Sequence, residues 1–189
     1  MKSRVGIKYN NILPFFVKNQ GYLGPNMVSV DKSLYPLLMG KREGSVYFNL
    51  NINIVGIKNS LQVLEDIVVS GGKIFFVGGA ITSIPVLLSL TLAQPEDLNI
   101  KISPWNFSKI SNTKDLDLLI LHEVENKSIL ESQSKTTPFI GVYCSTVKGV
   151  TYPINLNFEN IMLSNWYLYS IVCSCRRGLY RRNKKINEI

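Results

Sequence analysis

The sequence has few of the residues on which catalytic and metal sites are usually built. It contains one histidine, His122, and three cysteines, of which Cys173 and Cys175 form a pair without the second pair that a zinc site needs. Val77–Thr82 passes from an apolar run through glycines, as phosphate-binding loops do, but no lysine followed by serine or threonine completes the pattern. We therefore expect no catalytic residue, no cofactor and no metal ion, and we interpret the three cysteines as small buried side chains.

Long apolar runs are also missing. The stretch Ile161–Cys175 is shorter than the roughly 20 residues that cross a bilayer, and Ser164, Asn165 and Ser170 interrupt it. We expect a helix that packs on a sheet, and no membrane span. The first residues lack the apolar stretch and the cleavage site of a secretory signal, so we expect the protein to work in a reducing compartment.

Charged residues are scarce and unbalanced in sign. They make up 18% of the chain, below the roughly 25% of an average soluble protein, which indicates that much of the surface is covered by something. The 21 Lys and Arg outnumber the 13 Asp and Glu, and the net charge is +8. This excess predicts a polyanionic partner, either RNA or an anionic membrane, and the alternative is a protein that is merely basic.

Two groups of residues are candidates for contact with RNA. The C-terminal cations follow the last predicted helix, where they offset its macrodipole and can still meet phosphates, the alternative being a solvated tail. Tyr180 lies among them and can either stack on a base or pack on the domain. Two further cations in the first turn contact RNA or are simply solvated. The candidate RNA-binding residues are Lys41, Arg42, Arg176, Arg177, Tyr180, Arg181, Arg182, Lys184 and Lys185.

The hydrophobic pattern predicts an α/β fold. Lys73–Val77 and Phe139–Cys144 are short, continuous apolar runs, typical of central parallel strands that are covered on both faces. Apolar residues recur at helical spacing between Ile54 and Val68, and Gly71 and Gly72 end that helix. With a strand at Ser45–Leu50, this helix and the next strand form a predicted β-α-β unit. Further strands are expected at 98–102, 116–121 and 150–154, and further helices at 82–93, 128–134 and 157–172.

Alternation of strands and helices predicts a doubly wound, mostly parallel sheet with helices on both faces, of the flavodoxin or Rossmann kind. A chain of 189 residues is enough for one such domain. We expect an N-terminal tail over residues 1–31 with a short helix around Leu13–Val17, a single α/β domain over 32–175, and a basic C-terminal extension over 176–189.

Other chemistry-bearing residues have ordinary explanations beside functional ones. His122 follows a predicted strand and is interpreted as a loop residue. An acidic patch at Asp115, Asp117, Glu123 and Glu125 is a docking face for a basic neighbour or is only solvated. Trp105 and Phe107 pack in the core or contact RNA or a protein. The enzymatic alternative is a nucleotide-binding or sugar-phosphate enzyme that uses Val77–Thr82.

Three blocks of the chain resemble the S-two family of small-subunit ribosomal proteins. The first is Leu37–Leu50 with the helix at Leu61–Ile67, and the second is Gly72–Gly78, similar to the family's G-K-I-L-F-V-G. The third is Asp115–Leu121 followed by Thr137–Val142, Tyr152–Ile154, Asn157 and Ile161, which matches the family's closing half in order and spacing. The resemblance covers about residues 21–172.

The chain also departs from the family pattern. Gly79 and Ala80 replace a basic pair, Cys144 replaces an aspartate, and Asn155 with Leu156 stands where the family has Pro-Gly. The family's helical hairpin is lost, and only residues 94–114 take its place.

The resemblance implies a non-enzymatic ribosomal protein with no small-molecule substrate. Such a protein binds small-subunit rRNA and neighbouring ribosomal proteins near the junction of head and body. The eroded motifs suit a reduced ribosome, so the resemblance implies the mitochondrial small subunit, in the matrix.

Overall fold

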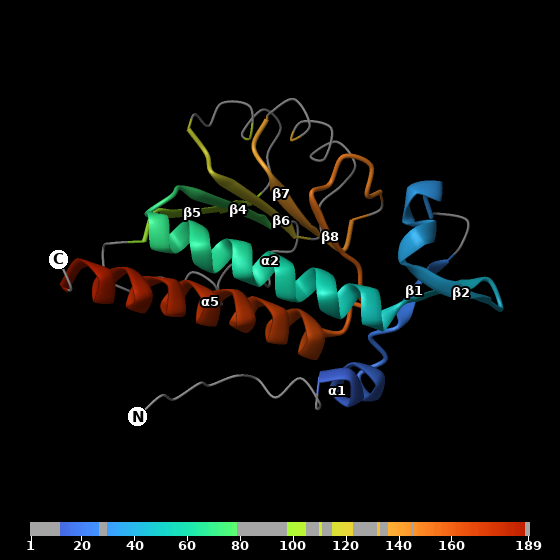
Figure 1. The fold of residues 1–189 in the computed structure, drawn as a ribbon. Coiled ribbons are helices and arrows are strands. Elements are labelled where there is room, and N and C mark those ends of the chain that lie inside the picture. Colours follow the sequence, from blue (N-terminus) through green and yellow to red (C-terminus); the bar gives the residue numbers. More distant parts are fainter. Residues whose placement is uncertain are drawn as a thin grey trace.

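A computed structural model describes residues 12–26, 30–78, 98–104, 110, 115–122, 132, 136–144 and 146–187. Its centre is a five-stranded sheet with two long helices on one face (Figure 1). The strands are β4 (Ile74–Gly78), β5 (Ile100–Pro104), β6 (Leu118–His122), β7 (Phe139–Val142) and β8 (Tyr152–Ile154). The helices are α2 (Leu50–Ser70) and α5 (Ile161–Asn187). This confirms the predicted α/β fold with a mostly parallel sheet.

All neighbouring strands of this sheet are parallel, in the order β5-β4-β6-β7-β8. If the five strands are numbered along the chain, the order is 2-1-3-4-5. Every residue of β4, β6 and β7 is buried, as their continuous apolar runs predict for strands covered on both faces. The strand expected at 150–154 lies at the edge of the sheet, as predicted.

The sheet divides the core into two parts because successive side chains point to opposite faces. Ile74, Phe76 and Ile120 pack with the buried sides of α2 and α5. Phe75 and Leu119 point the other way, into a smaller cluster that includes Ile110. The helices predicted at 82–93 and 128–134 lie outside the described residues, apart from Ser132.

The two helices lie side by side and run in the same direction across the sheet (Figure 1). Asn49 caps the start of α2, where its side chain accepts hydrogen bonds from the backbone N–H groups of Asn51 and Ile52. Gly71 ends the helix with a φ of 78°, a left-handed conformation that favours glycine. The predicted glycine cap is therefore confirmed. None of the helices in the described part of the chain is long and apolar enough to span a membrane.

The predicted β-α-β unit is wrong, because its first strand belongs to a second sheet. β1 (Leu23–Asn26), β2 (Leu38–Arg42) and β3 (Ser45–Phe48) form an antiparallel sheet in the order β1-β3-β2. In β3, buried Val46 and Phe48 alternate with half-buried Ser45 and Tyr47. Such alternation is typical of an antiparallel strand with one covered face, whereas β4 and β7 of the parallel sheet are apolar throughout.

A tight turn joins β2 to β3. Glu43 and Gly44 have φ values of 51° and 80°, and two positive φ values are what a two-residue hairpin of the I′ type requires. Four of the five residues of β2 are exposed. The hairpin extends away from the five-stranded sheet (Figure 1).

The N-terminal segment packs on the rest of the molecule. The predicted short helix is confirmed as α1 (Ile12–Lys18), and its Phe16 is fully buried. The Phe16 ring meets the Trp166 ring of α5 edge to face, with centroids 5.0 Å apart. Residues 12–26, expected to belong to a tail, therefore supply a helix, a strand and part of the core. A 3₁₀ helix, η3 (Lys32–Leu37), connects β1 to the hairpin.

The C-terminal extension expected over 176–189 also differs from the structure. The last helix was expected at 157–172, but α5 runs without interruption from Ile161 to Asn187. The helix continues through Gly178. This glycine packs closely on α2, since an added Cβ would lie 2.8 Å from the Glu65 carbonyl oxygen. Leu179 beside it is buried. The basic residues are thus part of a packed helix.

Candidate nucleic-acid interface

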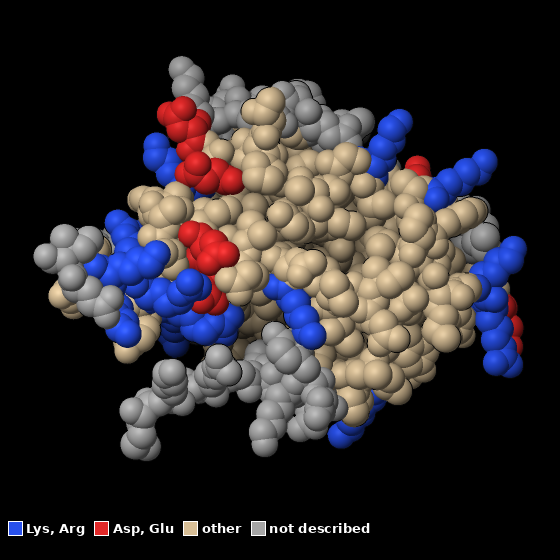
Figure 2. All heavy atoms as spheres, in the orientation of Figure 1, with Lys and Arg blue, Asp and Glu red and all other residues tan. Residues whose placement is uncertain are grey.

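The C-terminal half of α5 brings seven of the predicted RNA-binding residues to one end of the molecule. Figure 2 shows Lys and Arg side chains gathered at this end. Because an α-helix turns 100° per residue, these side chains lie on different sides of the helix. The seven residues are Arg176, Arg177, Tyr180, Arg181, Arg182, Lys184 and Lys185.

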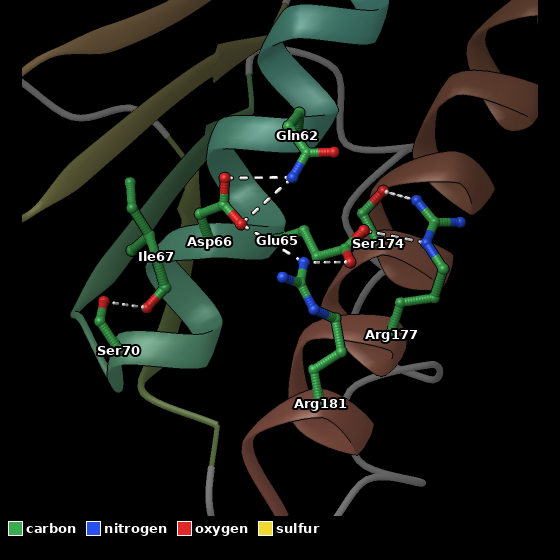
Figure 3. Close-up of polar contacts among 8 residues, drawn as sticks. All are labelled: Gln62, Glu65, Asp66, Ile67, Ser70, Ser174, Arg177 and Arg181. Carbon is green, nitrogen blue, oxygen red and sulfur yellow. Dashed lines mark hydrogen bonds and ion pairs between the residues drawn. The ribbon is translucent and has the colours of Figure 1, made fainter. Parts of the chain in front are cut away.

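Two of the seven face α2 and are held there by a carboxylate. Arg177 donates through Nε to Glu65 Oε2 at 3.0 Å, and Arg181 donates through Nη1 to Glu65 Oε1 at 2.8 Å (Figure 3). Arg181 also lies 3.4 Å from Asp66 Oδ1, and Arg177 donates to the Ser174 hydroxyl at 2.8 Å. The two arginines are four residues apart and so share one side of α5.

The Glu65 side chain is only 10% exposed, whereas those of Arg177 and Arg181 are 46% and 47% exposed. A buried carboxylate costs free energy unless cations and donors satisfy it, and here each oxygen accepts from a different guanidinium. The hydrogen bond from Arg181 to Glu65 raises the pKa of that guanidinium. Arg177 and Arg181, predicted to contact RNA, therefore hold α5 against α2.

Arg182 lies at the end of α2. An added Cβ at Gly71 would be 3.4 Å from the Arg182 guanidinium carbon, so this cation lies beside the C-terminal cap of α2. A positive charge there interacts favourably with the macrodipole of α2. Arg182 is half-buried in this position.

A neighbouring side of α5, about 80° around the helix from Arg177 and Arg181, presents an exposed stripe. Arg176, Tyr180 and Lys184 follow one another at intervals of four residues, and all three are exposed. The Tyr180 side chain is 73% exposed. Lys185 in the last turn is exposed as well. We refer to Arg176, Tyr180 and Lys184 as the outer stripe of α5.

The other predicted pair, Lys41 and Arg42, lies far from the outer stripe. Both residues are at the exposed end of β2, next to the hairpin turn. Figure 1 shows this hairpin and the C-terminus at opposite ends of the molecule. Arg42 lies 3.5 Å from Glu43, but both side chains are more than three-quarters exposed, so their ion pair contributes little stability. The structure thus offers two separate cationic regions.

Sequence reasoning missed Glu65 and Asp66, the partners of the α5 arginines. A signal was present: Glu65 directly follows Leu64 and lies three residues before Val68, two core positions of the α2 pattern. A carboxylate so near the buried side of a helix needs a cationic partner.

His122 is a strand residue, which corrects the interpretation of it as a loop residue. It is the last residue of β6, is fully buried and lies opposite Gly78 of β4. Burial lowers the pKa of His122 to about 4, so the ring is neutral at pH 7. Its centroid lies 6.2 Å from that of Phe76 and 5.8 Å from that of Phe158.

The cysteines fit their predicted role in part. Cys144 and Cys175 are buried and Cys173 is half-buried. Burial raises the pKa of the Cys144 and Cys175 thiols to about 12, so neither is a thiolate nucleophile at neutral pH. Among the described residues, no group of three His, Cys, Asp or Glu side chains could hold a metal ion.

A mostly apolar cavity of about 180 Å³ lies where β7 and β8 end against the small sheet. Asn155 beside it is held in place: its backbone N–H donates to Asn53 Oδ1 at 2.7 Å, and its Oδ1 accepts from the Cys144 N–H at 3.0 Å. The cavity is lined by Pro25, Val30, Leu34, Phe48, Tyr143, Cys144 and Asn155. Among these lining residues, burial raises the pKa of the Cys144 thiol and keeps it protonated, and the Tyr143 hydroxyl donates to Glu159 Oε1 at 2.7 Å.

Other candidates are only partly described. Asp117 Oδ2 accepts a hydrogen bond from the Lys73 backbone N–H at 2.7 Å, so this member of the acidic patch helps to fix the start of β4. Asp115 is exposed. Glu123, Glu125, Trp105, Phe107 and the part of the glycine-containing loop after Gly78 lie outside the described residues.

No protein-family model matches this chain, and no curated protein matches it either.

Proposed function

We propose that this protein is a non-enzymatic structural constituent of the mitochondrial small ribosomal subunit. In this proposal it binds small-subunit rRNA and neighbouring ribosomal proteins near the junction of head and body, in the mitochondrial matrix. The observation that carries the proposal is the outer stripe of α5, which presents cations and an exposed aromatic ring to solvent while Gly178, on the buried side of the same helix, packs on α2.

The sheet supports the proposed family. The blocks that resemble the S-two family include β4, β6, β7 and β8, which lie in one parallel sheet. The strand order 2-1-3-4-5 is that of flavodoxin-like doubly wound folds. A fold alone does not define a function, so the surface must supply the rest.

The surface supports contact with other macromolecules. Much of the face in Figure 2, over α2 and the N-terminal half of α5, carries few charged side chains. Exposed Ile161, Met162 and Tyr169 add apolar area to α5. A charge-poor surface suits neighbouring proteins, whereas the cationic end suits phosphates.

RNA binding across a salt series tests this proposal. The logarithm of the affinity for small-subunit rRNA is expected to fall with log salt by about 0.7 to 0.9 for each phosphate neutralised. Replacing Arg176, Lys184 and Lys185 by Gln lowers the slope. The matched control replaces Lys18, Lys32 and Lys148, three exposed lysines elsewhere on the molecule, and leaves more of the slope intact. Binding that does not depend on salt contradicts the proposal.

The alternative is a nucleotide-binding or sugar-phosphate enzyme. One observation favours it: Gly78 and His122 lie side by side at the carboxyl ends of β4 and β6, where the strand order reverses and such sheets bind ligands. Thermal stabilisation by a nucleotide, abolished by Gly78→Val, would support this function.

A further inference from the structure

The outer stripe of α5 places an aromatic ring midway between two cations. At a rise of about 1.5 Å per residue, Arg176 and Lys184 lie about 6 Å before and after Tyr180 along the helix axis. The Tyr180 side chain is 73% exposed, and both cations are exposed. Because most of Tyr180 lies in solvent, its ring is accessible to a partner.

The opposite side of the same helical segment is already occupied. Gly178, about 160° around the helix from Tyr180, packs on α2, and Leu179 is buried in the core. Arg177 and Arg181 lie between this buried side and the outer stripe and bind Glu65. An interfacial membrane helix needs a free apolar face opposite its cations, and here that face is covered. Beyond Tyr180, Ile186 is the exposed large apolar residue of this segment among the described residues. The outer stripe therefore favours RNA over a lipid surface.

A flat ring between cations fits one form of RNA better than another. Bases in a duplex are stacked on one another, so a helix surface that approaches a duplex meets mainly phosphates and sugars. An unpaired nucleotide exposes the face of its base and has phosphates on both sides. Stacking on tyrosine then accompanies phosphate contacts by the flanking cations.

We propose that Tyr180 is a stacking platform for an unpaired RNA base, with Arg176 and Lys184 holding the phosphates on either side of that nucleotide. This inference rests on the proposed RNA-binding function and adds to it the class of RNA bound. In this inference Arg177 and Arg181 position the helix through Glu65, and Arg176, exposed on the outer stripe, meets the ligand.

The test compares two single strands of about 12 nucleotides, oligoadenylate and an abasic strand with the same phosphates. Tyr180→Leu is expected to weaken binding of oligoadenylate about 5- to 150-fold and to leave binding of the abasic strand unchanged. Tyr180→Phe keeps the ring and the affinity. Tyr169→Leu is the matched control, because Tyr169 is 56% exposed on the same side of α5 but has no cation one turn away on either side.

Four results would overturn the inference. Equal losses with Tyr180→Leu on both strands would mean that the substitution acts on the helix and not on a stacked base. Equal losses with Tyr169→Leu would remove any special role of Tyr180. Tighter binding of an RNA duplex than of the single strand would identify a phosphate-only surface. Stronger binding to phosphatidylserine vesicles than to RNA would identify a membrane surface.

The inference and the proposed function fail differently. Wild-type protein that binds no RNA at any salt concentration contradicts both. Salt-dependent binding of rRNA that Tyr180→Leu does not weaken contradicts only the stacked base. Purified protein with Tyr180→Leu should unfold at the same urea concentration as the wild type, since the side chain is largely in solvent.

Discussion

Glu65 is a side chain of α2 that holds α5 in place. Its carboxylate is 10% exposed and accepts hydrogen bonds from two guanidiniums that are about half exposed. Such a site lies between two limits: exposed ion pairs contribute about 0 to 1 kcal/mol, and breaking a buried pair costs about 3 to 5 kcal/mol. The two ion pairs of Glu65 therefore help to hold α5 at this position along α2 and also add stability.

We expect Glu65→Gln to lower the free energy of unfolding by about 2 kcal/mol, because the amide cannot satisfy both guanidiniums. Urea unfolding measures this change. Asp66→Asn is the matched control: Asp66 is 56% exposed and 3.4 Å from Arg181, so its loss should cost at most about 0.5 kcal/mol. Equal effects of the two substitutions would contradict the role given to Glu65.

His122 gives the fold a dependence on pH. Its pKa is about 4 in the folded state and about 6.5 in the unfolded chain, so the unfolded state binds the proton first as the pH falls. The contribution of the neutral ring is complete above pH 6.5 and is lost between about pH 6.5 and 4. Over this window the loss amounts to about 3 kcal/mol.

The measurement is the free energy of unfolding of wild type and His122→Leu from pH 7.5 to 4. We expect the difference between the two proteins to shift by about 3 kcal/mol in favour of the variant as the pH falls. The shift with pH matters here, and not the absolute stability, since the substitution also changes core packing. A constant difference across the range would mean that His122 is not buried as a neutral ring.

At the scale of elements, α2 and α5 come close together at Gly178. A Cβ there would lie 2.8 Å both from the Glu65 carbonyl oxygen and from the Val68 Cβ, which is closer than real contacts allow. Alanine in an isolated helix would be favourable by about 1 kcal/mol over glycine, so packing and helix propensity predict opposite results at this position.

We expect packing to dominate, with Gly178→Ala lowering the free energy of unfolding by about 1 to 3 kcal/mol. Thermal unfolding is the measurement. Gly40→Ala is the control, because an added Cβ at Gly40 meets nothing within 4 Å. A rise in melting temperature with Gly178→Ala would show that the two helices are not in close contact there.

The central strands of the parallel sheet were predictable because their apolar runs identify them without knowledge of their neighbours. β4, β6 and β7 are buried along their whole length, and the sequence marks each of them. β3 was assigned to the wrong sheet, since a four-residue strand next to a helix has the same local pattern in either sheet. Its pairing with β1 joins residues far apart in the sequence, such as Leu23 with Tyr47, which no local pattern reveals.

The candidate site was predictable as a group of residues but not as an arrangement. The order of residues in the sequence places cations near the C-terminus. The side of the helix that each cation occupies depends on α5 continuing past Cys175. A glycine at position 178 is a plausible helix end in sequence, and only its contact with α2 shows otherwise. The pairing of Arg177 and Arg181 with Glu65 depends on the same packing of α5 on α2.

At the scale of the whole molecule, charge and its absence are separated in space. Cations gather at the end of α5 and at the β2 hairpin, at opposite ends of the molecule, and the face between them carries few charges (Figures 1 and 2). A protein with this distribution can contact nucleic acid at two points and neighbouring proteins between them. Both contacts belong to the proposed ribosomal role.

Sedimentation of a mitochondrial lysate through a sucrose gradient tests that role most directly. At low salt, the account predicts that the protein travels with small-subunit rRNA, and that high salt moves it to the top of the gradient because its phosphate contacts are screened. A protein that stays apart from small-subunit rRNA at low salt, after gentle lysis, would contradict the account.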